Sequence, residues 1–205
     1  MSFLSEHDKQ RILAAVENAE NQSSGEFVTV IARQADQYLY IPTLWAAILS
    51  LLTPAVVMTV HNSLDYQYVY VIQLCAFFAL GLLFRWQPIT LKLIPKAVKL
   101  QRAKRLAWEQ FFARGLHHTR ERNGVLFFVC VAERYVEIIA DKGINEKVDQ
   151  AQWDKIVSHF TDAVKKGNIA DGFVSSISAC GELLKSHFPR QADDTNELSN
   201  LLVEI

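Results

Sequence analysis

The sequence predicts an α/β fold in which a small mixed sheet is interrupted by a two-helix transmembrane hairpin. Two observations predict it. First, the uncharged apolar runs of residues 41–60 and 66–84 stand almost back to back, and each is long enough as a helix to cross a hydrocarbon core of roughly 30 Å. Second, stretches of helical periodicity alternate outside these runs with short segments rich in β-branched residues, which is the order of elements in an α/β domain.

Charge sets the expected orientation of the hairpin. The turn at residues 61–65 has no lysine or arginine, whereas seven basic residues follow the second run: Arg85, Lys92, Lys96, Lys99, Arg102, Lys104 and Arg105. The positive-inside rule places such a flank in the cytoplasm and the turn outside. We therefore expect a multi-pass protein of the plasma (inner) membrane with both termini cytoplasmic, and basic residues facing anionic lipid head groups. A hairpin buried in a soluble core is the alternative.

The remaining elements are expected outside the hairpin. Ser5 followed by Asp8 predicts a capping box that starts a helix with Ile12 and Val16 on its apolar face. The expected strands are residues 26–33, 125–132 and 135–140, and the later helices are residues 99–119, 148–164 and 171–187. Since a helix separates the first two strands, these should be parallel, whereas the short turn after the second strand predicts an antiparallel pair. The sheet is therefore expected to be mixed.

These elements predict five segments. Residues 1–37 and 99–189 are the two parts of a cytoplasmic domain, and residues 38–86 between them form the transmembrane hairpin. Residues 87–98 are an interfacial segment, and residues 190–205 are a polar tail. The end of the tail, residues 198–205, fits either a short docking helix or a disordered end. The charged first 22 residues contain no apolar core, so we expect no signal peptide there.

Composition and motifs exclude several activities. The net charge is −1, and the basic flank adjoins an apolar run and lacks interleaved stacking aromatics, so we expect no nucleic-acid partner. The sequence contains no G-x-S-x-G, P-loop, H-E-x-x-H or G-x-G-x-x-G motif. Their absence argues against the common hydrolase, nucleotide-binding and zinc-protease mechanisms.

Five short motifs carry a family resemblance. They are Ser24-Gly25-Glu26, Asn123-Gly124-Val125-Leu126, Glu133-Arg134, Asp141-Lys142-Gly143-Ile144, and Gly167 with Asp171-Gly172. In this order and spacing they resemble the TPM domain family of phosphatase-like and membrane-associated domains. The chain looks like a membrane branch with a hairpin inserted after the first strand.

The resemblance implies an αβα sandwich with a cleft at one edge of the sheet. The cleft candidates that it implies are Gly25, Glu26, Asn123, Gly124, Asp141, Gly143 and Gly172. In some soluble relatives this cleft is acidic and binds calcium, and Glu26, Asp141 and Asp149 would be the metal ligands here. Arg122 and Gln150 stand where the family often has acidic residues, which leaves too few carboxylates for the six to eight oxygen ligands of calcium.

The same residues also have structural interpretations. Gly25, Gly124 and Gly143 fit turns that need a positive φ, and Asn123 tolerates such a conformation. The leading expectation for function is a non-catalytic, membrane-anchored module that binds or assembles an unidentified protein partner, with no cofactor required. The alternatives are a calcium-dependent phosphatase of the TPM type and a structural subunit whose intramembrane Gln73, Thr53 or Pro54 contacts another membrane protein.

Overall fold

The structure, a computed structural model, describes residues 4–61, 64–190 and 202–205 and divides into two compact units. The first, here called the sandwich unit, is formed by residues up to 35 together with residues from 102 onward. The second, the hairpin unit, is formed by residues 36–101.

The sandwich unit is built around a sheet of four described strands. They are β1 (Glu26–Ala32), β2 (Gly124–Cys130), β3 (Tyr135–Ala140) and β4 (Leu202–Glu204), in the order β3-β2-β1-β4. β1 runs parallel to β2 and β4, and β2 runs antiparallel to β3. The predicted mixed sheet is therefore confirmed. Every residue of β1 and β2 is buried, as expected for strands covered on both faces.

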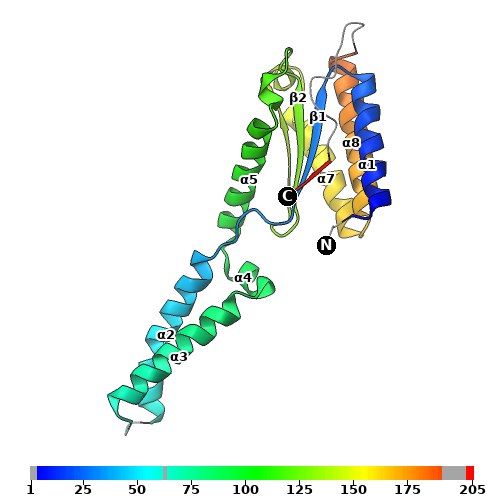
Figure 1. Ribbon diagram of the computed structural model, residues 1–205. Helices are drawn as coiled ribbons and strands as arrows, with labels where there is room; N and C mark the ends of the chain where they lie inside the picture. The colour runs from blue at the N-terminus through cyan, green and yellow to red at the C-terminus, as the bar shows by residue number, and fades with distance from the viewer. Residues whose placement is uncertain (1–3, 62–63, 191–201) are drawn as a thin grey trace. The chain divides into compact units, whose positions relative to one another are not determined.

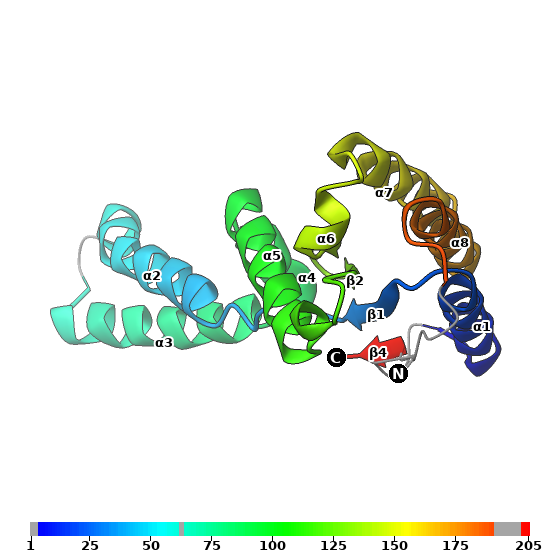
Figure 2. The same ribbon diagram turned by 90° about the horizontal axis from the view of Figure 1, so that it is seen from above.

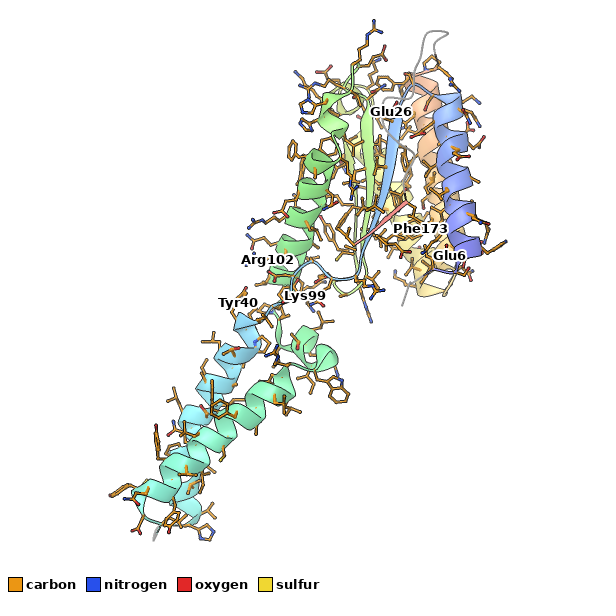
Figure 3. All side chains as sticks on the ribbon, in the orientation of Figure 1. Glu6, Glu26, Tyr40, Lys99, Arg102 and Phe173 are labelled. Carbon is orange, nitrogen blue, oxygen red and sulfur yellow. The ribbon has the colours of Figure 1, made fainter. Side chains whose placement is uncertain are left out.

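Helices cover both faces of the sheet (Figures 1 and 2). On one face lie α1 (Glu6–Gln22), α7 (Gln150–Lys165) and α8 (Ile169–His187), and the other face is covered by α5 (Lys96–Ala113). Phe27 and Phe127 of the sheet pack with Trp153 and Phe173 in the first core. Figure 3 shows Phe173 in this layer. Val28 and Phe128 pack with Ala107 and Phe111 of α5 in the second core, which completes an αβα sandwich.

Local sequence signals explain where most elements begin and end. The Ser5 Oγ accepts a hydrogen bond of 3.1 Å from the Asp8 N–H, so the predicted capping box at the start of α1 is confirmed. The helix predicted over residues 99–119 has other bounds in the structure, because α5 begins at Lys96 and ends at Ala113. Gly115 then takes a positive φ of 75° and leads into the 3₁₀ helix η1 (Leu116–His118), which breaks the helix expected to continue to residue 119.

The described end of the chain corrects a second expectation. Residues 202–204 form neither a helix nor a disordered end but the strand β4. The Ile205 N–H donates to the Ile31 carbonyl at 3.0 Å, and the Arg33 N–H donates to the Ile205 carbonyl at 2.8 Å. Residues 198–201 lie outside the described residues. The end of the chain thus pairs with part of the outer edge of β1.

The hairpin unit contains α2 (Tyr40–Val60) and α3 (Tyr66–Phe84), side by side, followed by the short α4 (Gln87–Leu93) (Figures 1 and 2). Both α2 and α3 are long and apolar enough to cross a membrane. Large apolar side chains such as Leu51, Phe78 and Leu82 are 68%, 69% and 76% exposed. In contrast, the small Ala46 and Ser50 of α2 are buried, which lets two helices approach closely.

Candidate functional site

Most of the predicted cleft residues lie at one end of the sheet. β1 and β2 are parallel and begin together, with Glu26 opposite Gly124, whereas β3 is antiparallel to β2 and ends there. The Glu26 N–H donates to the Asn123 carbonyl at 3.2 Å, and the Asp141 N–H donates to the Gly124 carbonyl at 2.9 Å. Figure 3 shows Glu26 at this end of β1. The topology thus brings Gly25, Glu26, Asn123, Gly124 and Asp141 together.

Asn123 ties the starts of the two central strands to each other. Its side chain is buried, and its Nδ2 donates a hydrogen bond to the Ser24 carbonyl, while its own N–H donates to Thr119 Oγ1 at 3.1 Å. Its Oδ1 is buried without a hydrogen-bond partner among the described residues. Asn123 therefore fixes the entry of both strands and keeps one spare acceptor.

Asp141 serves as a helix cap. Its Oδ1 accepts a 2.7 Å hydrogen bond from the Lys142 N–H at the start of α6 (Lys142–Asn145), and its Oδ2 lies 3.6 Å from Arg122 Nη1. Arg122 also donates to the His117 carbonyl at 2.5 Å. Arg122 thus forms an ion pair with the carboxylate that caps α6.

The three loop glycines do not serve turns with positive φ, so that interpretation is wrong. Among the described glycines, positive φ occurs at Gly115 and Gly167, and Arg122 adopts φ 54° before Asn123. Gly124 and Gly143 are instead required by crowding: a Cβ on Gly124 would lie 2.3 Å from the Leu116 carbonyl oxygen, and one on Gly143 would lie 2.6 Å from that of Glu121. On Gly25, a Cβ would meet Leu184 Cδ1 at 2.9 Å.

Two predicted site residues have other positions. Gly172 lies within α8, where a Cβ would meet Ala163 and Phe160 of α7 at 3.0 and 3.4 Å, so it serves helix packing. Asp149 is the residue before α7, and its side chain makes no capping hydrogen bond. No group of three or more histidine, cysteine, aspartate or glutamate residues in the described part of the chain is placed to hold a metal ion. The structure therefore does not gather Glu26, Asp141 and Asp149 into a calcium site.

A cleft of about 450 Å³ opens beside the strand ends. Its lining residues are Ser24, Glu121, Gly143, Glu146, Lys147, His187, Phe188, Pro189 and Arg190. Of the predicted candidates it contains Gly143 alone. The Lys147 ammonium lies 4.1 Å from the centre of the Phe188 ring, and Arg190 Nη1 donates to the Asn21 side chain at 3.0 Å. This cleft carries both signs of charge, since Glu121 and Glu146 line it together with Lys147 and Arg190.

Sequence reasoning missed the cleft residues that follow α6 and α8. Glu146 and Lys147 lie just after Asn145, His187 is the last residue of α8, and Arg190 follows Pro189. The end of α8 pairs with the segment before β1: Ser23 and Pro189 form an isolated bridge, and the Ser24 N–H donates to the Phe188 carbonyl at 3.0 Å. That pairing joins segments far apart in the chain, which local patterns do not report.

A half-buried glutamate near the same end of β1 was also missed. Glu20 Oε1 accepts a 3.0 Å hydrogen bond from the Phe27 N–H, at a point on β1 before the first residue that pairs with β4, Thr29. Burial raises the pKa of Glu20 to about 8, and nearby Glu26 and Glu17 act in the same direction, while the Phe27 N–H opposes them. This carboxyl group thus accepts a hydrogen bond at the edge of β1 before the point where β4 begins to pair.

The basic flank is distributed over three helices. Arg85 follows α3, Lys92 lies on α4, and Lys96, Lys99, Arg102, Lys104 and Arg105 lie on α5. Lys99 Nζ donates to the Leu91 carbonyl at 3.0 Å, and Arg105 Nε pairs with Glu109 at 2.7 Å. Figure 3 labels Lys99 and Arg102 on α5.

Comparisons with known proteins support the fold. The family model of the TPM domain matches residues 90–183, so the predicted resemblance is confirmed over that part of the chain. The NMR structure of the BA42 protein from the psychrophilic bacterium Bizionia argentinensis is similar, with a TM-score of 0.63 and 21% sequence identity, covering 99% of this chain and 96% of that chain. No curated protein matches the sequence.

Proposed function

We propose that this protein is a membrane-anchored module whose TPM-like sandwich unit binds or helps to assemble a protein partner. The observation that carries the proposal is the contrast between the two units. The sandwich unit has a complete core on both faces of its sheet, whereas only 11% of each apolar span is buried. Lipid is the environment that such exposed apolar helices require.

The proposal includes a topology. In it, residues 38–86 form the transmembrane hairpin, inserted between residues 1–37 and 99–189 of one cytoplasmic domain. The turn without basic residues faces out, and both termini stay in the cytoplasm at the inner membrane. Residues 87–98 and the seven basic residues of the flank then lie at the anionic surface of the membrane.

A binding role agrees with the chemistry of the strand ends. Asp141 is occupied by a helix cap and by Arg122, and Asn123 holds the strand entries together. These residues have structural roles, and no cluster of the described residues is placed to hold a metal ion. We therefore propose that the protein acts by binding a partner on its surface.

The test is a pull-down from detergent-solubilised membranes. The tagged full chain is compared with a variant in which residues 38–86 are replaced by an unrelated two-span hairpin. A partner recovered with both proteins binds the sandwich unit, and one recovered with the native hairpin alone contacts it within the membrane. If neither protein enriches any partner over a tagged unrelated membrane protein, the proposed function is wrong.

A calcium-dependent phosphatase of the TPM type is a second candidate. The observation that favours it is the pair of buried oxygens without hydrogen bonds at the strand ends, Asn123 Oδ1 and Asp141 Oδ2, because calcium binds oxygen ligands. The described residues do not supply the full ligand set. We therefore expect millimolar calcium to raise the Tm by no more than about two degrees, since stabilisation is small when the Kd is itself near millimolar.

Thermal melts with and without calcium check this expectation, with magnesium as the control. An increase of about ten degrees that Asp141→Asn abolishes would support the phosphatase instead. Turnover of a generic aryl phosphate is expected at background, because the described residues form no cluster of carboxylates or other ligands that would hold a cation beside the transferring phosphoryl group.

A further inference from the structure

β3 is an edge strand whose outer side pairs with no other strand in the described residues. Along an antiparallel pair, backbone groups point alternately to the partner and away from it. The Asp141 N–H is bonded to the Gly124 carbonyl of β2, so the backbone groups of every second residue back from Asp141 also point to β2. The N–H and C=O groups of the residues between them, including Val136 and Ile138, point away from β2. An edge of this kind accepts an added strand.

A groove of about 300 Å³ runs along this edge. Its floor is formed by residues 136–140 of β3, one wall by Trp108 of α5, and the other by Gln150, Trp153, Asp154 and Val157 of α7, with Asn145 at one end. The two walls come from helices on opposite faces of the sheet. An extended peptide added to β3 would therefore lie between two tryptophan side chains.

The charged side chains that line the groove are acidic. They are Glu137 and Asp154, and no lysine, arginine or histidine lines it. Glu137 is half-buried and accepts a 2.8 Å hydrogen bond from the Tyr135 hydroxyl. Burial raises the pKa of Glu137, whereas the hydrogen bond from the Tyr135 hydroxyl and the charge of nearby Lys104 lower it. A carboxylate partly removed from water gains most from a cation delivered by a ligand.

The two tryptophans differ in exposure, and Trp108 is the one that presents an apolar surface to a ligand. Trp153 is 1% exposed, and its Nε1 has no hydrogen-bond acceptor among the described residues, although a buried indole N–H usually finds one. Trp108 is 39% exposed and lies 5.9 Å from the ring of Phe112, which is 52% exposed. The groove thus continues onto an aromatic patch of Trp108 and Phe112.

We propose that the open edge of β3 and its groove bind an extended, basic segment of a partner protein by strand addition. The backbone of that segment pairs with Val136 and Ile138. Since Glu137 and Trp108 lie on the α5 face, a lysine or arginine on that face meets Glu137 and lays its aliphatic stem on Trp108, while the alternate apolar side chains face α7. This inference rests on the proposed function and names its contact surface and the chemistry of its partner.

The test measures peptide binding by the full chain in nanodiscs of zwitterionic lipid, which do not attract a basic peptide. Two of the four tryptophans, Trp45 and Trp86, lie in the hairpin unit, so replacing both with phenylalanine leaves Trp108 and Trp153 as fluorescence reporters. The probe is a seven-residue peptide that alternates valine with lysine. Its matched controls are a valine–glutamate peptide and a backbone N-methylated copy.

We expect saturable changes in fluorescence with the valine–lysine peptide and none with the two controls. Glu137→Gln retains an acceptor for Tyr135 and should weaken binding roughly tenfold, as for the loss of one charge-assisted contact. Val136→Pro removes an outward N–H without breaking the β2 ladder and should abolish binding. Glu146→Gln, in the other cleft, should leave binding unchanged. Circular dichroism confirms that each variant is folded.

Equal binding of the lysine and glutamate peptides, or binding that survives both Val136→Pro and Glu137→Gln, would overturn the inference. A concentration-dependent dimer that Val136→Pro dissolves would also overturn it, because a second copy would then occupy the edge. These outcomes concern the groove alone. If the pull-down partners persist with the Glu137→Gln chain while the peptide does not bind, the proposed function stands and this inference fails.

Discussion

Single residues at the strand ends are fixed by the room around them. Gly124 sits against the backbone of Leu116, which cannot move without displacing η1, whereas Gly25 sits against the flexible end of the Leu184 side chain. The two glycines begin neighbouring strands but differ in what a methyl group would meet. Their substitution therefore separates backbone crowding from side-chain crowding.

We expect Gly124→Ala to lower the free energy of unfolding by about 1–3 kcal/mol, the usual cost of overpacking. Gly25→Ala should cost less, because Leu184 can adopt another rotamer. Urea denaturation of the two variants measures the difference. Equal destabilisation would show that the contact with Leu116 does not dominate.

Glu20 makes the stability of the sandwich unit depend on pH. The pKa of Glu20 is about 8 in the folded protein against an ordinary value of 4.5. Because the folded-state pKa is raised, the stability associated with the neutral carboxyl group is fully present below pH 4.5 and is lost progressively as the pH rises through about 8. Glutamine at this position retains the acceptor for the Phe27 N–H and cannot ionise.

The Glu20→Gln variant should therefore lose less stability than the native chain between pH 5 and about pH 9. Denaturation midpoints across this range measure the effect, and Glu182→Gln at an exposed position of α8 is the control. Parallel pH profiles for the native and Glu20→Gln chains would contradict the assignment.

At the scale of elements, periodicity and charge predicted most of the structure. The spans of α2 and α3, the strands β1, β2 and β3, and the helices α1, α7 and α8 all follow from local patterns. β4 does not, because three residues of a polar tail become a strand only where β1 offers an open edge. The end of α5 was missed because a left-handed Gly115 outweighs the apolar residues that follow it.

The candidate site was predicted in part for the same reason. Residues next to strand ends, such as Asn123 and Asp141, come together because strand direction places them at one edge. Lys147, His187 and Arg190 reach the cleft through the packing of α6 and α8, which no single-sequence pattern describes. Gly172 was a cleft candidate through the family resemblance alone, whereas in α8 it packs against Ala163 and Phe160 of α7.

The orientation of the helical hairpin is the prediction at this scale. With Cys75→Ser removing the exposed native thiol, a cysteine that replaces His61 should react with an impermeant maleimide in intact cells. If the basic flank faces the cytoplasm, as proposed, a cysteine at the exposed Lys165 of α7 should react only after lysis. The reverse labelling would refute the topology.

The whole molecule consists of a sandwich unit whose sequence is divided by a second unit. If residues 38–86 are an insertion, a chain that lacks them and has a short glycine–serine linker should be a soluble monomer with a cooperative thermal melt. Circular dichroism and sedimentation measure both properties. Loss of helix and sheet signal would mean that the hairpin belongs to the core.

Chain order has a consequence for biosynthesis. β1 and β2 are adjacent in the sheet, but the entire hairpin unit is translated between them, and β4 arrives with the last residues. During translation, both edges of the apolar strand β1 therefore remain unpaired until β2 has emerged from the ribosome as far as Cys130. Such an intermediate is prone to aggregation. Nascent chains stalled before residue 124 should thus depend on chaperones far more than those stalled after residue 190.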